Sequence, residues 1–221
     1  MRAVRVCTGF VLVASGALMY AASWQRWSGA CGWGQEEGAT CGPLQDHRYD
    51  FVVPRAPWEP VGDAATLAGL SLLALALAVV VLPAALAGRR PHLVVSVAAV
   101  ALGLAVADAG LATVRSGIAG QVMSTWGGGL SGALGFLVLP AMLAGLAVVT
   151  RGWPLAAAVL LTLASPLVAA FTYAVGPYDA QPWWEAVSGT FTAAAGLCLV
   201  MAARGVRRPS ASGLSPTPVR T

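Results

Sequence analysis

Apolar stretches alternate with short polar connections along most of the chain. Six stretches are almost free of charge, and all but the last comfortably reach the about 20 residues that a helix needs to cross a bilayer. They cover residues 4–23, 64–87, 93–114, 130–150, 155–175 and 186–203. The pattern therefore predicts an all-α, polytopic membrane protein, a helical bundle with six transmembrane helices within residues 1–203.

The first stretch also has the outline of a secretory signal peptide, because Arg2 and Arg5 precede its apolar run. Cleavage after Ala22 would place Tyr20 three residues before the cut, where signal peptides carry a small residue. We therefore expect the first stretch to stay in the protein as a membrane span.

Composition supports a membrane protein. The chain is 57% hydrophobic and 10% charged, whereas a soluble domain carries about 25% charged residues. Its net charge of +4 is spread over separate connections and not gathered in one patch, so we expect no nucleic-acid partner. The Ala-, Gly-, Leu-, Val- and Arg-rich alphabet is typical of a GC-rich bacterial gene, and we expect a multi-pass protein of the plasma membrane.

The arginines predict an orientation. With both termini in the cytoplasm, nine arginines lie inside and four outside, in agreement with the positive-inside rule. The connections 24–63, 115–129 and 176–185 are then extracytoplasmic. Residues 204–221 are basic and rich in Pro and Ser, which predicts a disordered cytoplasmic tail near anionic lipid.

The outer loop 24–63 holds most of the polar chemistry, including six of the nine acidic residues. Cys31 and Cys41 lie in it, and an oxidising compartment predicts a disulfide between them. The chain has no Cys-x-x-Cys pair, which argues against thiol catalysis. Asp46, His47 and Asp50 have no recognised ligand spacing, so we expect a solvated acidic loop without a metal or other cofactor.

Asp108 is the only acidic residue inside a predicted span. Carboxylates in membranes are costly and are functional candidates by default. Arg115 follows seven residues later on the same helix face and is its expected partner. The pair would couple a proton or a cation to transport, or else it is a structural ion pair near the outer interface.

Tryptophan is strongly skewed towards the predicted outer side, whereas an interfacial belt normally decorates both faces. Seven of the eight tryptophans lie there: Trp24, Trp27, Trp33, Trp58, Trp126, Trp183 and Trp184. We expect the outer loops to form a cap over the bundle. This cap is either purely structural or a surface that binds a protein, a lipid or a sugar chain.

Small residues and a short repeat add two weaker expectations. A stripe of small residues along 93–114 predicts closely packed helices and would also suit a homo-oligomer. VLPAALAG at 81–88 is similar to VLPAMLAG at 138–145. This likeness indicates either duplicated helical hairpins, as some transporters have, or chance in a chain rich in Ala, Leu and Gly.

No hydrolytic triad, phosphate-binding loop or paired intramembrane histidine is present in the sequence. The leading hypothesis is therefore a non-enzymatic accessory or scaffolding protein of the lipid bilayer, which binds a membrane protein partner or forms a homo-oligomer. One alternative is a small secondary transporter with Asp108 as the coupling residue. Another is a membrane enzyme that acts on lipid or cell-wall precursors through the outer carboxylates.

Overall fold

The computed structural model describes residues 1–32, 38–172 and 181–205, and within these ranges the regular structure is helical. A π-helical turn, η3 (Leu134–Val138), joins α4 to α5 into one continuous segment, Gly128–Val149. Two short 3-10 helices, η1 (Gly42–Gln45) and η2 (His47–Tyr49), lie in the outer loop. The α-helices are α1 (Arg2–Trp27), α2 (Ala64–Ala87), α3 (Leu93–Ala119), α4 (Gly128–Ala133), α5 (Leu139–Val149), α6 (Trp153–Leu163), α7 (Pro166–Thr172) and α8 (Trp184–Arg204).

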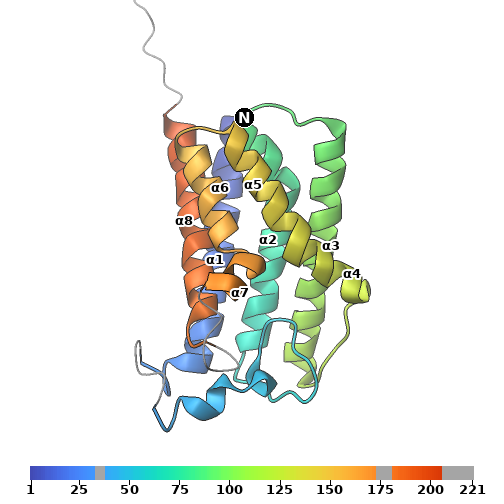
Figure 1. Cartoon of the computed structure of the whole chain (residues 1–221), viewed down its shortest axis with the longest axis vertical. Coiled ribbons are helices and arrows are strands. Elements are labelled where there is room, and N and C mark those ends of the chain that lie inside the picture. Colours follow the sequence, from blue (N-terminus) through green and yellow to red (C-terminus); the bar gives the residue numbers. More distant parts are fainter. Residues whose placement is uncertain (33–37, 173–180, 206–221) are drawn as a thin grey trace, which may run out of the picture.

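The helices form two layers (Figure 1). In the first layer α8 packs on α1, α1 on α2, and α2 on α3. In the second layer α6 packs against α8 and α2, and α5 packs against α6. The segment Gly128–Val149 meets α3 near α4 and leans away from it towards the end where α1 begins.

Within the described part of the chain, five helices are long and apolar enough to cross a membrane: α1, α2, α3, Gly128–Val149 and α8. They match five of the six predicted spans, and α8 is a regular helix despite its polar start. The remaining predicted span, 155–175, is interrupted within its described part, and residues 173–175 lie outside the described residues. α6 ends at Leu163, and α7 begins at Pro166, which has no N–H to continue a helix and disfavours helical geometry in the residue before it.

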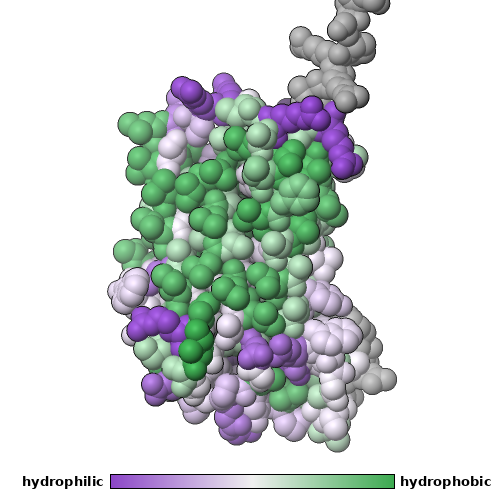
Figure 2. Space-filling model, turned by 180° about the vertical axis from the view of Figure 1, so that it is seen from behind, coloured by the Kyte–Doolittle hydropathy of each residue, from purple (hydrophilic) through white to green (hydrophobic). Residues whose placement is uncertain are grey.

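The outward faces of the long helices are apolar. Figure 2 shows an apolar band across the middle of the molecule between two polar ends. Large side chains on these faces, among them Leu77, Leu93, Val94 and Leu104, are 67–79% exposed. A water-soluble protein rarely exposes a contiguous apolar surface of this extent. The arrangement is that of a multi-pass membrane protein.

Glycines set the close approach of the long helices, as the small residues predicted. The Gly16 backbone lies directly against Gly189 of α8. A Cβ on Gly9 would come within 2.7 Å of the Gly196 carbonyl oxygen, and one on Gly110 within 3.1 Å of the Gly69 carbonyl oxygen. Helix backbones at such distances gain van der Waals contact that larger residues would prevent.

Candidate functional site

The outer loop is folded onto the bundle. A disulfide joins Cys31 to Cys41, with a Cα–Cα distance of 4.8 Å, which confirms the predicted pair. Both cysteines are buried against Trp27 and Trp183. The Trp183 indole N–H donates to the Cys31 carbonyl oxygen at 2.9 Å, and this hydrogen bond links the disulfide-bonded loop to the start of α8.

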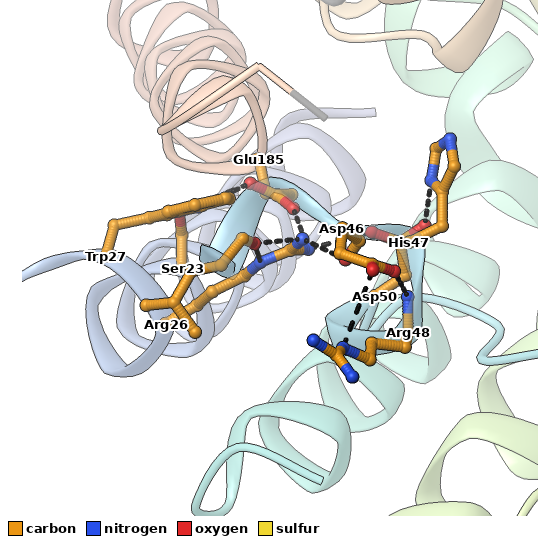
Figure 3. A network of polar contacts seen from close by, with 9 residues as sticks. Ser23, Arg26, Trp27, Asp46, His47, Arg48, Asp50 and Glu185 are labelled. Carbon is orange, nitrogen blue, oxygen red and sulfur yellow. Dashed lines mark hydrogen bonds and ion pairs between the residues drawn. The ribbon is translucent and has the colours of Figure 1, made fainter. Parts of the chain in front are cut away.

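Arg26 is the centre of a buried polar network in this region (Figure 3). Its Nη1 donates to the Asp50 carboxylate at 2.8 Å. Its Nε and Nη2 donate to the Leu44 carbonyl oxygen at 3.1 and 2.8 Å. The guanidinium carbon lies 4.3 Å from the centre of a Trp27 ring. One side chain at the end of α1 therefore holds both short helices of the outer loop in place.

Glu185, in the first turn of α8, completes the network and is also buried. Its Oε2 accepts from the Trp27 indole N–H at 3.1 Å and from the Ser23 hydroxyl at 3.5 Å. Its Oε1 lies 3.7 Å from Arg26 Nη1. Asp50 and Glu185 thus share one guanidinium, and the network ties α1, the outer loop and α8 together (Figure 3).

His47, Arg48 and their carboxylate partners form exposed pairs in the outer loop. His47 lies 2.8 Å from Asp50, and Arg48 lies 3.4 Å from Glu59 and 3.5 Å from Asp46. Among the described residues, no group of three or more His, Cys, Asp or Glu side chains is placed to hold a metal ion. These carboxylates keep the loop folded, and their pairing gives no geometric reason for a catalytic role.

Asp108 has a different environment from the one that its sequence position suggested. Its carboxylate accepts from the backbone N–H groups of Trp126 and Gly127, both at 2.9 Å, and from the Ser131 hydroxyl at 2.7 Å. These donors stand at the start of α4, where a helix leaves N–H groups without internal partners. Asp108 therefore caps the fourth membrane segment from the neighbouring helix.

The expected ion pair between Asp108 and Arg115 is not formed among the described residues. The Arg115 guanidinium lies instead 5.8 Å from the centre of a Trp126 ring. The reason is geometric: Asp108 has three donors within 2.9 Å on the following segment, whereas Arg115 is two helical turns away.

The predicted outer tryptophans divide into two groups. Trp27 and Trp183 are buried in the cap, and Trp58 and Trp184 are partly buried. Trp24 and Trp126 are 52% and 77% exposed, and Trp24 packs against Tyr20 and Trp183. Trp33 lies outside the described residues. The tryptophans thus serve partly as the core of a folded cap, while binding to the cap stays a prediction.

A small cavity with mostly apolar walls lies inside the bundle, next to the break between α6 and α7. Its volume is about 90 Å³. Ser15 of α1 and Ser71 of α2 exchange hydrogen bonds across one wall, since each hydroxyl donates to the other residue's carbonyl oxygen, at 2.9 and 2.8 Å. The cavity is also lined by Pro166, Glu185, Ser188 and Thr192. Glu185 therefore belongs both to the cavity wall and to the buried network.

The segment Gly128–Val149 is the least packed of the five long helices. In its most apolar stretch 17% of the residues are buried, against 33–44% in the other four. Leu139 N–H donates to the Leu134 carbonyl oxygen, five residues back, just before Pro140. This π-helical turn accommodates the proline, whose ring would otherwise clash with the preceding turn. Beside α4 lies an open groove of about 650 Å³ that Arg55 and Phe136 also line.

Sequence reasoning missed Arg26 and Glu185, which lie 159 positions apart. Each stands at the end of an apolar stretch, where a charged residue is ordinary, so neither gave a local signal. Comparison of the chain with protein-family models, with curated proteins and with solved structures gave no match.

Proposed function

We propose that the protein is a non-enzymatic accessory or scaffolding subunit of the membrane, which binds a transmembrane helix of a partner protein along α4 and η3. One observation carries this proposal: the glycines of this region are not covered. A Cβ added at Gly128, Gly129, Gly132 or Gly135 would meet nothing within 4 Å.

The glycines of the other long helices behave differently. Each one in α1, α2, α3 and α8 lies against a neighbouring helix: Gly9, Gly16, Gly69, Gly103, Gly110, Gly117, Gly189 and Gly196. In this fold, helical glycines are therefore contact points between helices. Gly128, Gly132 and Gly135 follow one another at helical spacing, and Gly128 and Gly132 line the open groove of about 650 Å³. A partner helix would give them the contact that the other glycines already have.

The same proposal includes six crossings and cytoplasmic termini. α6 begins at the end of the molecule where α5 finishes, whereas α8 begins beside Trp27 at the opposite end (Figure 1). The chain between Val149 and Trp183 must therefore traverse the bundle, which supports a sixth, interrupted crossing through α6 and α7. The arginine-rich end then faces the cytoplasm of the cell that carries the protein in its plasma membrane.

The experiment is purification of the tagged protein from its native membrane in mild detergent, with photo-crosslinking from two positions. A crosslinker at Leu137 of η3 should capture a stoichiometric membrane protein, whereas one at Val97 of α3 should not. Both side chains are similarly exposed, at 55% and 59%. Gly132→Leu should abolish co-purification, and Val97→Leu is its matched control. A protein without a stoichiometric partner, or equal capture from both positions, would remove the proposal.

A small secondary transporter is the second candidate. It is favoured by the interruption between α6 and α7 beside the cavity that Glu185 lines, since transporters build their sites at such breaks. In this candidate Glu185 would be the coupling residue, because it lines the cavity while Asp108 caps α4. Glu185→Gln should then abolish proton flux in proteoliposomes and Asp108→Asn should preserve it. An absence of flux in the parent protein would eliminate the candidate.

A further inference from the structure

The arginine-rich end of the molecule has a groove of its own. α3 and α5 diverge there, and α2 forms the floor between them (Figure 1). The groove measures about 390 Å³. Its walls are apolar and come from all three helices: Pro83, Ala87, Val95, Met142, Leu146 and Val149. At its mouth, in the connection from α2 to α3, stand Arg89, Arg90 and His92.

Arg89 and Arg90 are exposed, and neither hydrogen bonds nor pairs with another described residue. Other arginines at this end are engaged with helix ends. Arg5 Nε donates to the Ala85 carbonyl oxygen at 2.8 Å, and Arg151 Nη1 donates to the Thr150 carbonyl oxygen at 2.9 Å. The mouth of the groove therefore carries two guanidinium groups whose donors are unused.

Among the described residues, no carboxylate side chain is placed to neutralise them. The sequence has no Asp or Glu in residues 64–107 or 109–178. The described acids lie towards the opposite end, in the outer loop, on α3 beside the start of α4, and in the first turn of α8. The charged side chains of the tail after α8 are all positive: Arg207, Arg208 and Arg220. The tail is therefore not a suitable occupant of this groove.

We propose that this groove binds one anionic phospholipid from the leaflet at the arginine-rich end. Arg89 and Arg90 would hold the phosphate, for which guanidinium groups have matching donor geometry. An acyl chain would enter between α3 and α5 and pass over Gly145, where a Cβ would meet nothing within 4 Å. Basic pockets between membrane helices are the usual recognition sites for acidic headgroups.

The groove is also placed for a ligand that arrives from the bilayer. Leu93 and Val94 on α3 and Val148 on α5 flank it and are 74–79% exposed. A soluble phosphate would use the arginines and leave the apolar walls without a partner. A neutral lipid would fill the walls and leave the arginines without one. Only an amphipathic anion matches both parts of the groove.

The test uses the full-length protein in mild detergent, with native mass spectrometry after titration with phosphatidylglycerol or with phosphatidylcholine of the same acyl chains. We expect one phosphatidylglycerol to be retained in preference to phosphatidylcholine. Arg89→Gln with Arg90→Gln should weaken its retention about 30-fold, since each arginine beside anionic lipid contributes about a fivefold factor. Gly145→Phe should weaken retention without changing the charge, because its ring would fill the groove.

The matched control is Arg2→Gln with Arg204→Gln, which removes the same charge from the same end but outside the groove. This control variant should retain phosphatidylglycerol to within about twofold of the parent protein. Equal loss in the control would show diffuse attraction and would overturn the site. Displacement by millimolar glycerol phosphate would identify a headgroup site that needs no acyl chain, and would overturn it as well. Equal retention of phosphatidylglycerol and phosphatidylcholine would also overturn the site.

Discussion

The buried arginine of the outer network allows a direct test of what stabilises the fold. Arg26→Met removes a guanidinium whose side chain is 0% exposed and leaves a side chain that can still fill apolar space. Glu185, at 3% exposure, then has no cation within 4 Å among the described residues, whereas Asp50, at 35%, can turn towards water. An uncompensated buried charge of this kind costs about 3–5 kcal/mol.

We expect about 3 kcal/mol, the lower end of that range, because Trp27 continues to donate to Glu185. For a chain of this size the loss corresponds to a fall of about 6–12 °C in melting temperature. Adding Glu185→Gln to Arg26→Met should recover part of the loss, because the amide carries no charge. Arg48→Met is the control: its pairs are exposed, and the expected cost is below about 1 kcal/mol.

The two free cysteines provide the assay. Cys198 is buried within α8 and Cys7 is exposed on α1. In a Cys7→Ser background, a thiol-reactive fluorophore should label Cys198 only when α8 separates from the bundle. Melting is then followed as fluorescence in mild detergent. If Arg26→Met melted within about 2 °C of its parent, or if Glu185→Gln failed to raise the melting temperature of Arg26→Met, the buried-charge explanation would be wrong.

The disulfide, the Asp108 cap and the glycine contacts each carry an expectation of their own. Opening the Cys31–Cys41 bond should lower the free energy of unfolding by about 2–3 kcal/mol, seen as a lower melting temperature in reductant that Cys41→Ser reproduces. Asp108→Ala should lower the free energy of unfolding by about 1–2 kcal/mol, because the N–H groups at the start of α4 lose their acceptor. Asp108→Asn should cost less in the same melting assay, and equal costs for the two variants would contradict capping. Gly16→Leu should leave little monodisperse protein on size-exclusion chromatography, since α8 lies against that position, whereas Gly132→Leu should stay monodisperse, because a side chain there meets nothing within the fold. A monodisperse profile for Gly16→Leu would contradict the packing of α1 on α8.

The membrane helices were predictable because the length of an apolar stretch is a local property. The broken helix was not. Proline stands inside three of the predicted spans, at Pro83, Pro140 and Pro166. α2 continues through Pro83, and a π-helical turn absorbs Pro140, so only at Pro166 does the helix stop. Proline removes one hydrogen bond in each case, and the surrounding packing decides which response follows.

The polar sites were likewise predictable only where the partners lie close together in the sequence. The disulfide was predictable, because two cysteines in one outer loop leave a single natural pairing. Helical spacing suggested a partner for Asp108 seven residues away, but its actual donors lie 18 to 23 residues on, in the next segment. The contact of Arg26 with Glu185 joins residues 159 positions apart. Helix periodicity describes neighbours on one helix and cannot name the helix that lies opposite.

The two ends of the molecule differ in how their charge is balanced, and this difference bears on orientation. At the outer end, Arg26 and Arg48 are each surrounded by carboxylates of the same chain. At the other end, the described arginines have no carboxylate partner within the described residues. Arg89 and Arg90 at the groove mouth make neither a hydrogen bond nor an ion pair with another described residue. That end gains about 1 kcal/mol for each arginine beside an anionic leaflet, and the cytoplasmic leaflet is the anionic one. In the proposed orientation these arginines face the anionic leaflet, and Arg89 and Arg90 among them are the ones that the proposed lipid site uses.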